Sequence, residues 1–149
     1  MPIDPQNEIL SLSTVIKDCE MLSLVIPGPI PSKKNSKNVF YKNGRMMVIS
    51  SKNHQDWHKI SSVGLKSAPR INGNIKLVLC IIYAKDRRKF DLTNKIESVF
   101  DLLVDCGIID DDNYEILSKI LITFGGIDKE SPRAEVTFFT NVCKLQETI

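Results

Sequence analysis

The chain has 149 residues, of which 42% are hydrophobic and 26% are charged, and its formal net charge is +2. These values are typical of one globular domain with a single core. The longest apolar run, residues 77–83, is too short to span a bilayer, and Asp4 and Glu8 lie where an export signal would carry basic residues. We therefore expect a cytoplasmic protein that has no membrane partner.

Hydrophobic periodicity and turn residues predict six strands and two helices. In chain order these are strands at residues 22–26, 39–42 and 45–49, a helix capped by Ser50 or Ser51 that runs to about Lys66, a strand at 75–83, a helix at 91–106, and strands at 116–124 and 134–140. Asn43-Gly44 favours a type I′ hairpin turn, and Gly125-Gly126 predicts a turn between the last two strands.

This order of elements predicts a single α+β domain over residues 21–149, in which the two helices pack on one mixed β-sheet. Residues 1–20 show no clear amphipathic period and are expected to form an N-terminal extension. The four cysteines show no CxxC spacing, so we expect reduced, buried thiols rather than zinc ligands or a disulfide framework.

The second predicted helix has an apolar stripe and a polar stripe. The apolar stripe consists of Leu92, Ile96, Val99, Phe100 and Leu103. The polar stripe consists of Asp91, Asn94, Ser98, Asp101 and Asp105, with Lys95 and Glu97 beside it. An acidic stripe is usually the solvated face of a helix, and a role as N-cap would by itself explain Asp91.

A second acidic group, residues 110–112, follows this helix directly. Three adjacent carboxylates repel one another, so a bound cation would relieve an electrostatic cost. The run does not fit an EF-hand calcium loop, because Tyr114 and Glu115 occupy positions that require Asp or Asn and then Gly. Since a basic run precedes Asp91, the two acidic groups together predict the divalent-metal site of a nuclease that acts on a phosphodiester backbone.

Several motifs occur in a defined order. D-L-x-N begins at Asp91, an aspartate lies in the following helix, and G-x-x-x-D-D ends at Asp112. Upstream stand a Pro-Gly-Pro segment, a basic loop and Asn-Gly-Arg in the predicted hairpin. Over roughly residues 24–140 the chain resembles the RusA-type Holliday junction resolvases of bacteria and their phages. The resemblance implies a homodimer that uses Mg²⁺ or Mn²⁺ to cut branched, four-way DNA by paired symmetric nicks.

Position by position, the resemblance implies catalytic roles for Asp91, Asn94 and Asp112, and Asp111 matches the acid just before the last of these. Asp101 matches the aspartate within the helix. Thr93 stands where the best-known members have a second aspartate, and Glu97 stands where they have a catalytic lysine. We therefore hypothesise that Glu97 is a replacement metal ligand and that Lys95 supplies the missing positive charge. The predicted contacts to the DNA backbone are Lys33, Lys34, Asn35, Lys37, Arg45, Arg87, Arg88 and Lys89.

Other sites are less well supported. His54 and His58 are one helical turn apart, a spacing that can bind zinc, but a solvated helix face is favoured because no third ligand is near them in the sequence. Trp57 is expected in the core rather than as a base-stacking platform. No GxxxxGK[ST] phosphate loop occurs, so no nucleotide cofactor is expected. Two alternatives stay open: a RusA-like protein that binds junctions without efficient cleavage, and a non-enzymatic protein-interaction module.

Overall fold

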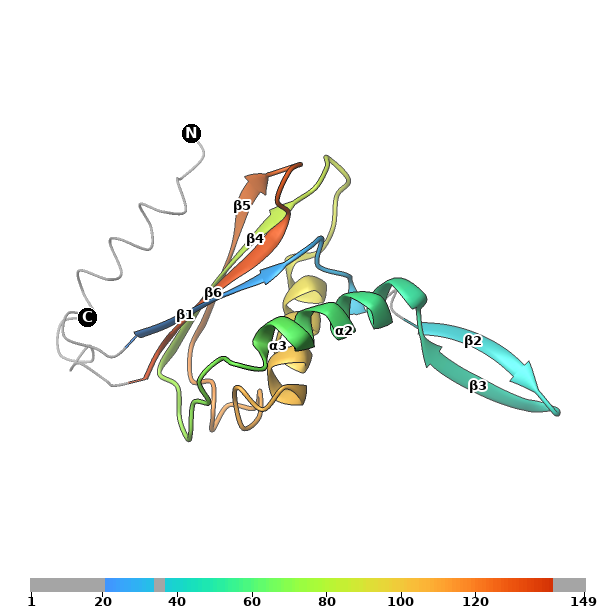
Figure 1. Ribbon diagram of the computed structural model, residues 1–149, viewed down its shortest axis with the longest axis horizontal. Coiled ribbons are helices and arrows are strands. Elements are labelled where there is room, and N and C mark those ends of the chain that lie inside the picture. Colours follow the sequence, from blue (N-terminus) through green and yellow to red (C-terminus); the bar gives the residue numbers. More distant parts are fainter. Residues whose placement is uncertain (1–20, 34–36, 141–149) are drawn as a thin grey trace.

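The computed structural model describes residues 21–33 and 37–140 (Figure 1). Its elements are β1 (Met21–Pro27), β2 (Lys37–Lys42), β3 (Arg45–Ser50), α2 (Lys52–Leu65), β4 (Leu77–Ala84), α3 (Leu92–Asp105), β5 (Ile120–Ile127) and β6 (Arg133–Phe139). The predicted α+β class, the order of elements and the mixed sheet are confirmed. Neither of the two described helices is long and apolar enough to cross a membrane. The predicted extension over residues 1–20 lies outside the described ranges.

The main sheet has four strands in the order β1-β6-β4-β5. Among the strands that the structure describes, only β4 and β5 run parallel to each other, and α3 lies on the connection between them, as a parallel pair requires. The hairpin of β2 and β3 forms a separate two-stranded sheet. Among the described strands, the hairpin is therefore not part of the mixed sheet: its strands pair with each other and extend away from that sheet (Figure 1).

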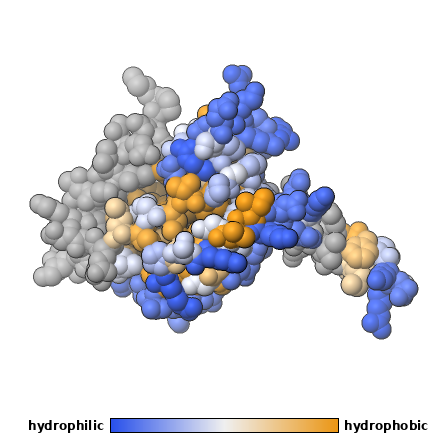
Figure 2. Space-filling view, in the orientation of Figure 1, coloured by the Kyte–Doolittle hydropathy of each residue, from blue (hydrophilic) through white to orange (hydrophobic). Residues whose placement is uncertain are grey.

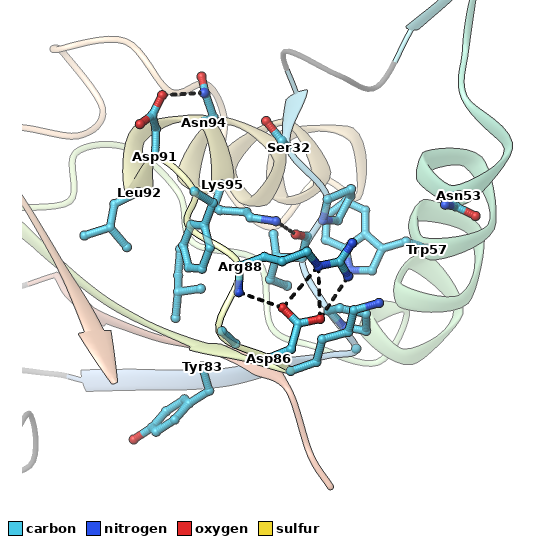
Figure 3. Close-up of a pocket in the computed structure, with 18 of the residues that line it drawn as sticks. Ser32, Asn53, Trp57, Tyr83, Asp86, Arg88, Asp91, Leu92, Asn94 and Lys95 are labelled. Atoms are coloured by element: carbon cyan, nitrogen blue, oxygen red, sulfur yellow. Dashed lines mark hydrogen bonds and ion pairs between the residues drawn. The ribbon is translucent and has the colours of Figure 1, made fainter. Parts of the chain in front are cut away.

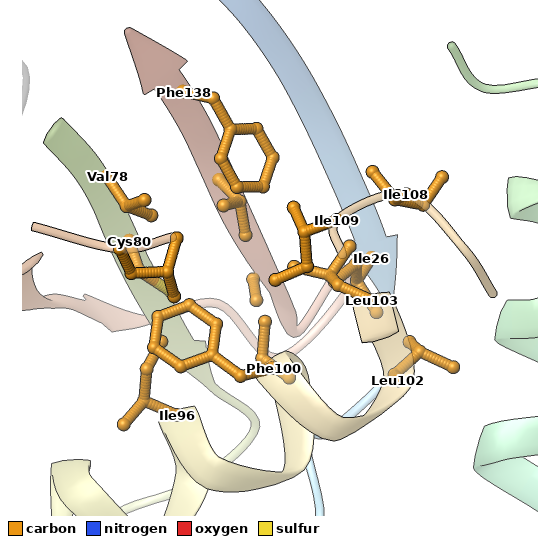
Figure 4. Packing of buried hydrophobic residues seen from close by; sticks show 14 of the residues in the cluster. Ile26, Val78, Cys80, Ile96, Phe100, Leu102, Leu103, Ile108, Ile109 and Phe138 are labelled. Atoms are coloured by element: carbon orange, nitrogen blue, oxygen red, sulfur yellow. The ribbon is translucent and has the colours of Figure 1, made fainter. Parts of the chain in front are cut away.

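The core lies between α3 and one face of the main sheet (Figure 4). Strand β4 contributes Val78, Cys80 and Ile82 to it, and the first six residues of this strand are all buried. The predicted apolar stripe of α3 is confirmed, with Val99 and Leu103 fully buried. Each such side chain contributes about 1.5–3 kcal/mol through burial. Cys80 lies in the same core, where burial raises the pKa of its thiol to about 12.

Helix α2 follows its N-cap residue Ser51 and packs beside α3. The Ser51 Oγ accepts a hydrogen bond from the His54 backbone N–H at 3.3 Å, so the predicted N-cap is confirmed. Trp57 is buried and belongs to the core cluster, as predicted. At the other helix, Gly107 follows the C-terminus of α3 with φ of +72°, the left-handed conformation that commonly ends helices.

The predicted turn at Gly125-Gly126 is wrong, because both glycines lie inside β5, which continues to Ile127. A Cβ atom at Gly125 would lie 2.6 Å from the Cε1 atom of Tyr83 on the neighbouring strand β4. The β4–β5 register also shifts between Ile82 and Tyr83. Gly125 therefore allows close packing against the Tyr83 ring beside a local irregularity of the strand pair. It does not change the direction of the chain.

Candidate active site

Asp91 lies at the N-terminus of α3, where its backbone is extended (φ −86°, ψ 125°) and its carbonyl accepts hydrogen bonds from the N–H groups of Asn94 and Lys95. Its side chain, however, makes no capping hydrogen bond. Instead, the Asp91 Oδ2 accepts a hydrogen bond of 3.1 Å from the Asn94 Nδ2 (Figure 3). Capping therefore does not explain this carboxylate, which is exposed and has its orientation set by Asn94.

Asp91 lines a wide groove with a volume of about 1670 Å³ (Figure 3). Its walls come mainly from the end of β1 and the loop after it (residues 27–32), from α2, and from the end of β4 through the following loop to the first turn of α3 (residues 82–95). The cations that line it are Lys85, Arg87, Arg88, Lys89 and Lys95, and the acids are Asp56, Asp86 and Asp91. Because the cations outnumber the acids, the groove suits a polyanion.

Within the groove, Arg88 and Asp86 form a local unit. The Arg88 Nη2 lies 2.9 Å from Asp86 Oδ2, and the Arg88 backbone N–H donates to Asp86 Oδ1 at 3.0 Å. The side-chain hydrogen bond from Arg88 lowers the pKa of Asp86. This exposed pairing links Arg88 to Asp86 just before Asp91, and it leaves the exposed Arg87 and Lys89 on either side of Arg88.

Lys95 is directed into the groove wall rather than along the polar stripe of α3. Its Nζ donates to the Ile30 carbonyl at 2.6 Å and lies 4.9 Å from the centre of the Phe90 ring. Burial, followed by the positive charges of Arg88 and Lys85, lowers the pKa of Lys95. Lys95 therefore ties α3 to the loop after β1, a geometry that does not suit its hypothesised role beside the acids.

A different lysine accompanies the acids. The Lys33 Nζ lies 2.7 Å from the Asp101 Oδ2. The hydrogen bond with Asp101 raises the pKa of Lys33, and the negative charges of Asp101, Glu97 and Asp112 act in the same direction. These three acids are here called the acidic cluster. Asp101 contacts Lys33 directly, whereas Glu97 and Asp112 act on it through their charge, and among the described residues the three do not form a group that could hold a metal by itself. Sequence reasoning included Lys33 only as a DNA contact, since the basic loop gives no sign of this partner.

The acids of residues 110–112 have different environments. Partial burial, followed by the neighbouring carboxyl of Asp111, raises the pKa of Asp112. The Asp111 Oδ1 accepts the backbone N–H of Asp112 at 2.8 Å. Asp110 instead accepts hydrogen bonds from the Gly73 N–H (3.1 Å) and the Arg70 guanidinium (2.7 Å), which lower its pKa. Asp110 is thus a structural residue, whereas Asp112 belongs to the acidic cluster.

The two histidines of α2 lie beside the same face of α3. The His58 Nε2 is 2.9 Å from the Asp105 Oδ2, a contact that joins α2 to α3. The His54 ring packs edge-on against Trp57, and burial, followed by the charge of His58, lowers the pKa of His54. Among residues 21–33 and 37–140, no three or more His, Cys, Asp or Glu side chains form a group that could hold a metal. The zinc interpretation of this histidine pair therefore gains no support.

The predicted DNA contacts fall into separate places. Arg87, Arg88 and Lys89 line the groove, together with Lys85, which sequence reasoning missed although it begins the same basic run. Arg45 is exposed near the tip of the β2–β3 hairpin. Lys34, Asn35 and the side chain of Lys37 lie outside the part of the chain that the structure describes.

The structure thus combines a cation-lined groove, an oriented aspartate at its edge, and an acidic cluster that lies partly on the same helix and partly in the segment after it. Carboxylates that bind a divalent ion, beside cations that bind phosphates, are the groups that metal-assisted phosphodiester hydrolysis requires. No model of a known protein family matches this chain, and no curated protein matches it.

Proposed function

We propose that this protein is a divalent-metal-dependent endodeoxyribonuclease of the RusA type, which acts as a homodimer and resolves four-way DNA junctions by paired symmetric nicks. One observation carries the proposal. The carboxylate of Asp91 does not cap its helix but is oriented by Asn94 at the edge of a groove lined by cations. A bound cation beside a phosphodiester explains an aspartate in that position better than a contribution to helix stability does.

The acids suit Mg²⁺ or Mn²⁺. Asp101 pairs with Lys33, and the negative charges of Glu97 and Asp112 act on the same lysine, which supports a cation at this place. No complete cage of three ligands exists among the described residues. Mg²⁺, however, is commonly bound by one or two carboxylates together with phosphates of the substrate. In this proposal Asp91 and Asp112 would hold the ion, with Asp111 and Glu97 as neighbouring carboxylates.

The protein's own residues have distinct roles in this reaction. A bound metal ion would polarise a phosphate oxygen and lower the pKa of a bound water. Asn94 keeps the Asp91 carboxylate in one orientation. Lys33, rather than Lys95, is the lysine beside the acids, where it would stabilise the extra negative charge of the transition state. The groove cations hold the DNA backbone without reading its sequence.

The test compares Asp91→Asn and Asp112→Asn with the wild-type protein on a synthetic four-way junction. Both variants are expected to lose at least about 100-fold in nicking with Mg²⁺, yet to bind the junction as well as, or better than, the wild type at low salt. Asp110→Asn is the matched control, because Asp110 pairs with Arg70 and Gly73 and should leave nicking intact. Undiminished nicking by Asp91→Asn would refute the proposed metal site.

A second candidate is a junction-binding protein that cuts poorly. Thr93 and Glu97 favour it, because they remove a carboxylate and a lysine that the best-known RusA members carry. Tight binding of the wild-type protein to the junction, without nicking in either Mg²⁺ or Mn²⁺, would support this candidate. Failure to bind any junction at low salt, where electrostatic affinity is greatest, would instead favour a protein-interaction module.

A further inference from the structure

The hairpin of β2 and β3, here called the arm (residues 37–50), extends away from the rest of the molecule (Figure 1). Asn43 and Gly44 both have positive φ, 54° and 77°, and make the tight turn at its tip. A two-stranded hairpin on its own is marginally stable in water. The arm is therefore expected to complete its surface with a partner.

One face of the arm is apolar and strongly exposed. Tyr41 pairs with Met46, and Val39 lies two residues along on the same face. Their exposed fractions are 75%, 62% and 59%. The opposite face carries the less exposed apolar pair of Phe40 and Met47 (39% and 41%), followed by the cross-strand pair of Lys42 and Arg45 at the tip. Figure 2 shows apolar residues along the arm and hydrophilic residues at its end.

The charge of the arm restricts its partner. Residues 37–50 contain Lys37, Lys42 and Arg45 but no aspartate or glutamate. The partner must therefore be anionic and must also offer a flat apolar surface. DNA meets both requirements, because phosphates border the exposed faces of unstacked bases and a two-stranded β-ribbon fits its grooves. Contact with the arm of a second copy would instead bring two positively charged arms together, and their charges would repel each other.

The arm is also continuous with the groove. Strand β3 ends at Ser50, and the next residue, Ser51, already lines the groove, as does Ser32 before β2. DNA that lies in the groove would pass the base of the arm. We propose that the arm is a second DNA contact, which places Tyr41 and Met46 against unstacked bases at a branch point while Lys42 and Arg45 bind the flanking phosphates. This inference rests on the proposed function, since the same DNA occupies both places.

The experiment uses the full chain and a four-way junction that carries 2-aminopurine beside its branch point, without added divalent cation. Binding of the wild-type protein is expected to raise the fluorescence, because 2-aminopurine brightens when its stacking is lost. Tyr41→Ser/Met46→Ser should bind about tenfold more weakly and should lack the fluorescence rise. Val63→Ser/Ile120→Ser is the matched control, since these exposed apolar residues lie outside both the arm and the groove. Unchanged thermal melting shows that the variants are folded.

Three results would overturn the inference. The arm variant could retain both the affinity and the fluorescence rise, while the wild-type protein still binds and nicks the junction; only the role of the arm then fails. Sedimentation could show that the arm variant dissociates an oligomer with DNA binding unchanged, which would assign the arm to a second copy of the chain. Finally, the wild-type protein could fail to bind the junction at low salt, in which case the proposed function fails as well.

Discussion

The Lys33 Nζ lies 2.7 Å from the Asp101 Oδ2, and these side chains are 38% and 36% exposed, respectively. An ion pair this exposed to solvent contributes at most about 1 kcal/mol. It can therefore open at little cost when a better partner arrives. A divalent cation that binds the acidic cluster would compete with Lys33, and a DNA phosphate would then offer the released ammonium a new partner.

Lys33→Met is accordingly expected to change metal binding and nicking in opposite directions. Mn²⁺ should bind more tightly to the free protein, because its competitor is gone. Nicking should fall by about 100-fold, because the transition state loses a cation. Mn²⁺ titration followed by electron paramagnetic resonance measures the first effect, and a junction-nicking assay measures the second. Lys95→Met is the control for Mn²⁺ affinity, since Lys95 bonds to the Ile30 carbonyl instead. Weaker Mn²⁺ binding by Lys33→Met would mean that Lys33 organises the acids rather than competing for them.

Arg87→Ala is expected to weaken junction binding and to reduce the slope of log affinity against log salt by about 1, because one phosphate contact is lost. Arg88→Ala should cost more, since it removes a cation and also leaves Asp86 unpaired in the groove. Lys119→Ala, at a lysine that does not line the groove, should leave the slope unchanged. Equal slopes for all three variants would exclude the groove as the DNA path.

Asp112→Asn is expected to melt at a higher temperature than the wild-type protein at pH 7. The pKa of Asp112 is raised in the folded state, mainly by burial, so its ionised form costs stability above that pKa. This advantage should disappear as the pH falls to the ordinary value of 3.8, where the folded wild-type side chain is also neutral. Melting curves at several pH values measure the effect.

Asp110→Asn is expected to shift the melting temperature in the opposite direction. The pKa of Asp110 is lowered by the Gly73 N–H and by Arg70, so its ionised form stabilises the fold above pH 3.8, and this contribution is lost as the pH falls through the lowered pKa. At pH 7 this variant should therefore melt below the wild-type protein. Melting shifts of the same sign for both variants would contradict the different environments of the two acids.

Gly125→Ala is expected to destabilise the fold by about 1–3 kcal/mol, because its Cβ would meet the Tyr83 ring and the Ile81 Cγ2 at 2.6–2.7 Å. Gly64→Ala, inside α2 with nothing within 4 Å of its Cβ, should instead stabilise by about 0.5–1 kcal/mol. Urea unfolding of both variants measures the two effects. A Gly125→Ala protein as stable as the wild type would show that Tyr83 can move away without cost.

Local signals predicted much of the fold. The helical period of Ile96, Val99 and Leu103 identified the buried face of α3, since that spacing brings apolar side chains onto one side. Asn43-Gly44 identified the hairpin, because both residues tolerate positive φ. Gly125-Gly126 misled, because glycine has the same local signature whether it turns the chain or makes room for a neighbouring ring. Only the partner strand, with Tyr83, decides between these uses.

The amino-acid sequence alone determined the periodicity of α3, the basic run before Asp91 and the three-residue spacing of Asp91 and Asn94. Each of these features depends only on residues that are close along the chain. The tertiary structure decided which lysine accompanies the acids. Lys33 and Asp101 meet only after the loop beyond β1 folds against α3, while Lys95, next to Asn94 in sequence, bonds to the Ile30 carbonyl of that loop instead of to an acid. Charges act through space, so their partners are set by packing rather than by spacing along the chain.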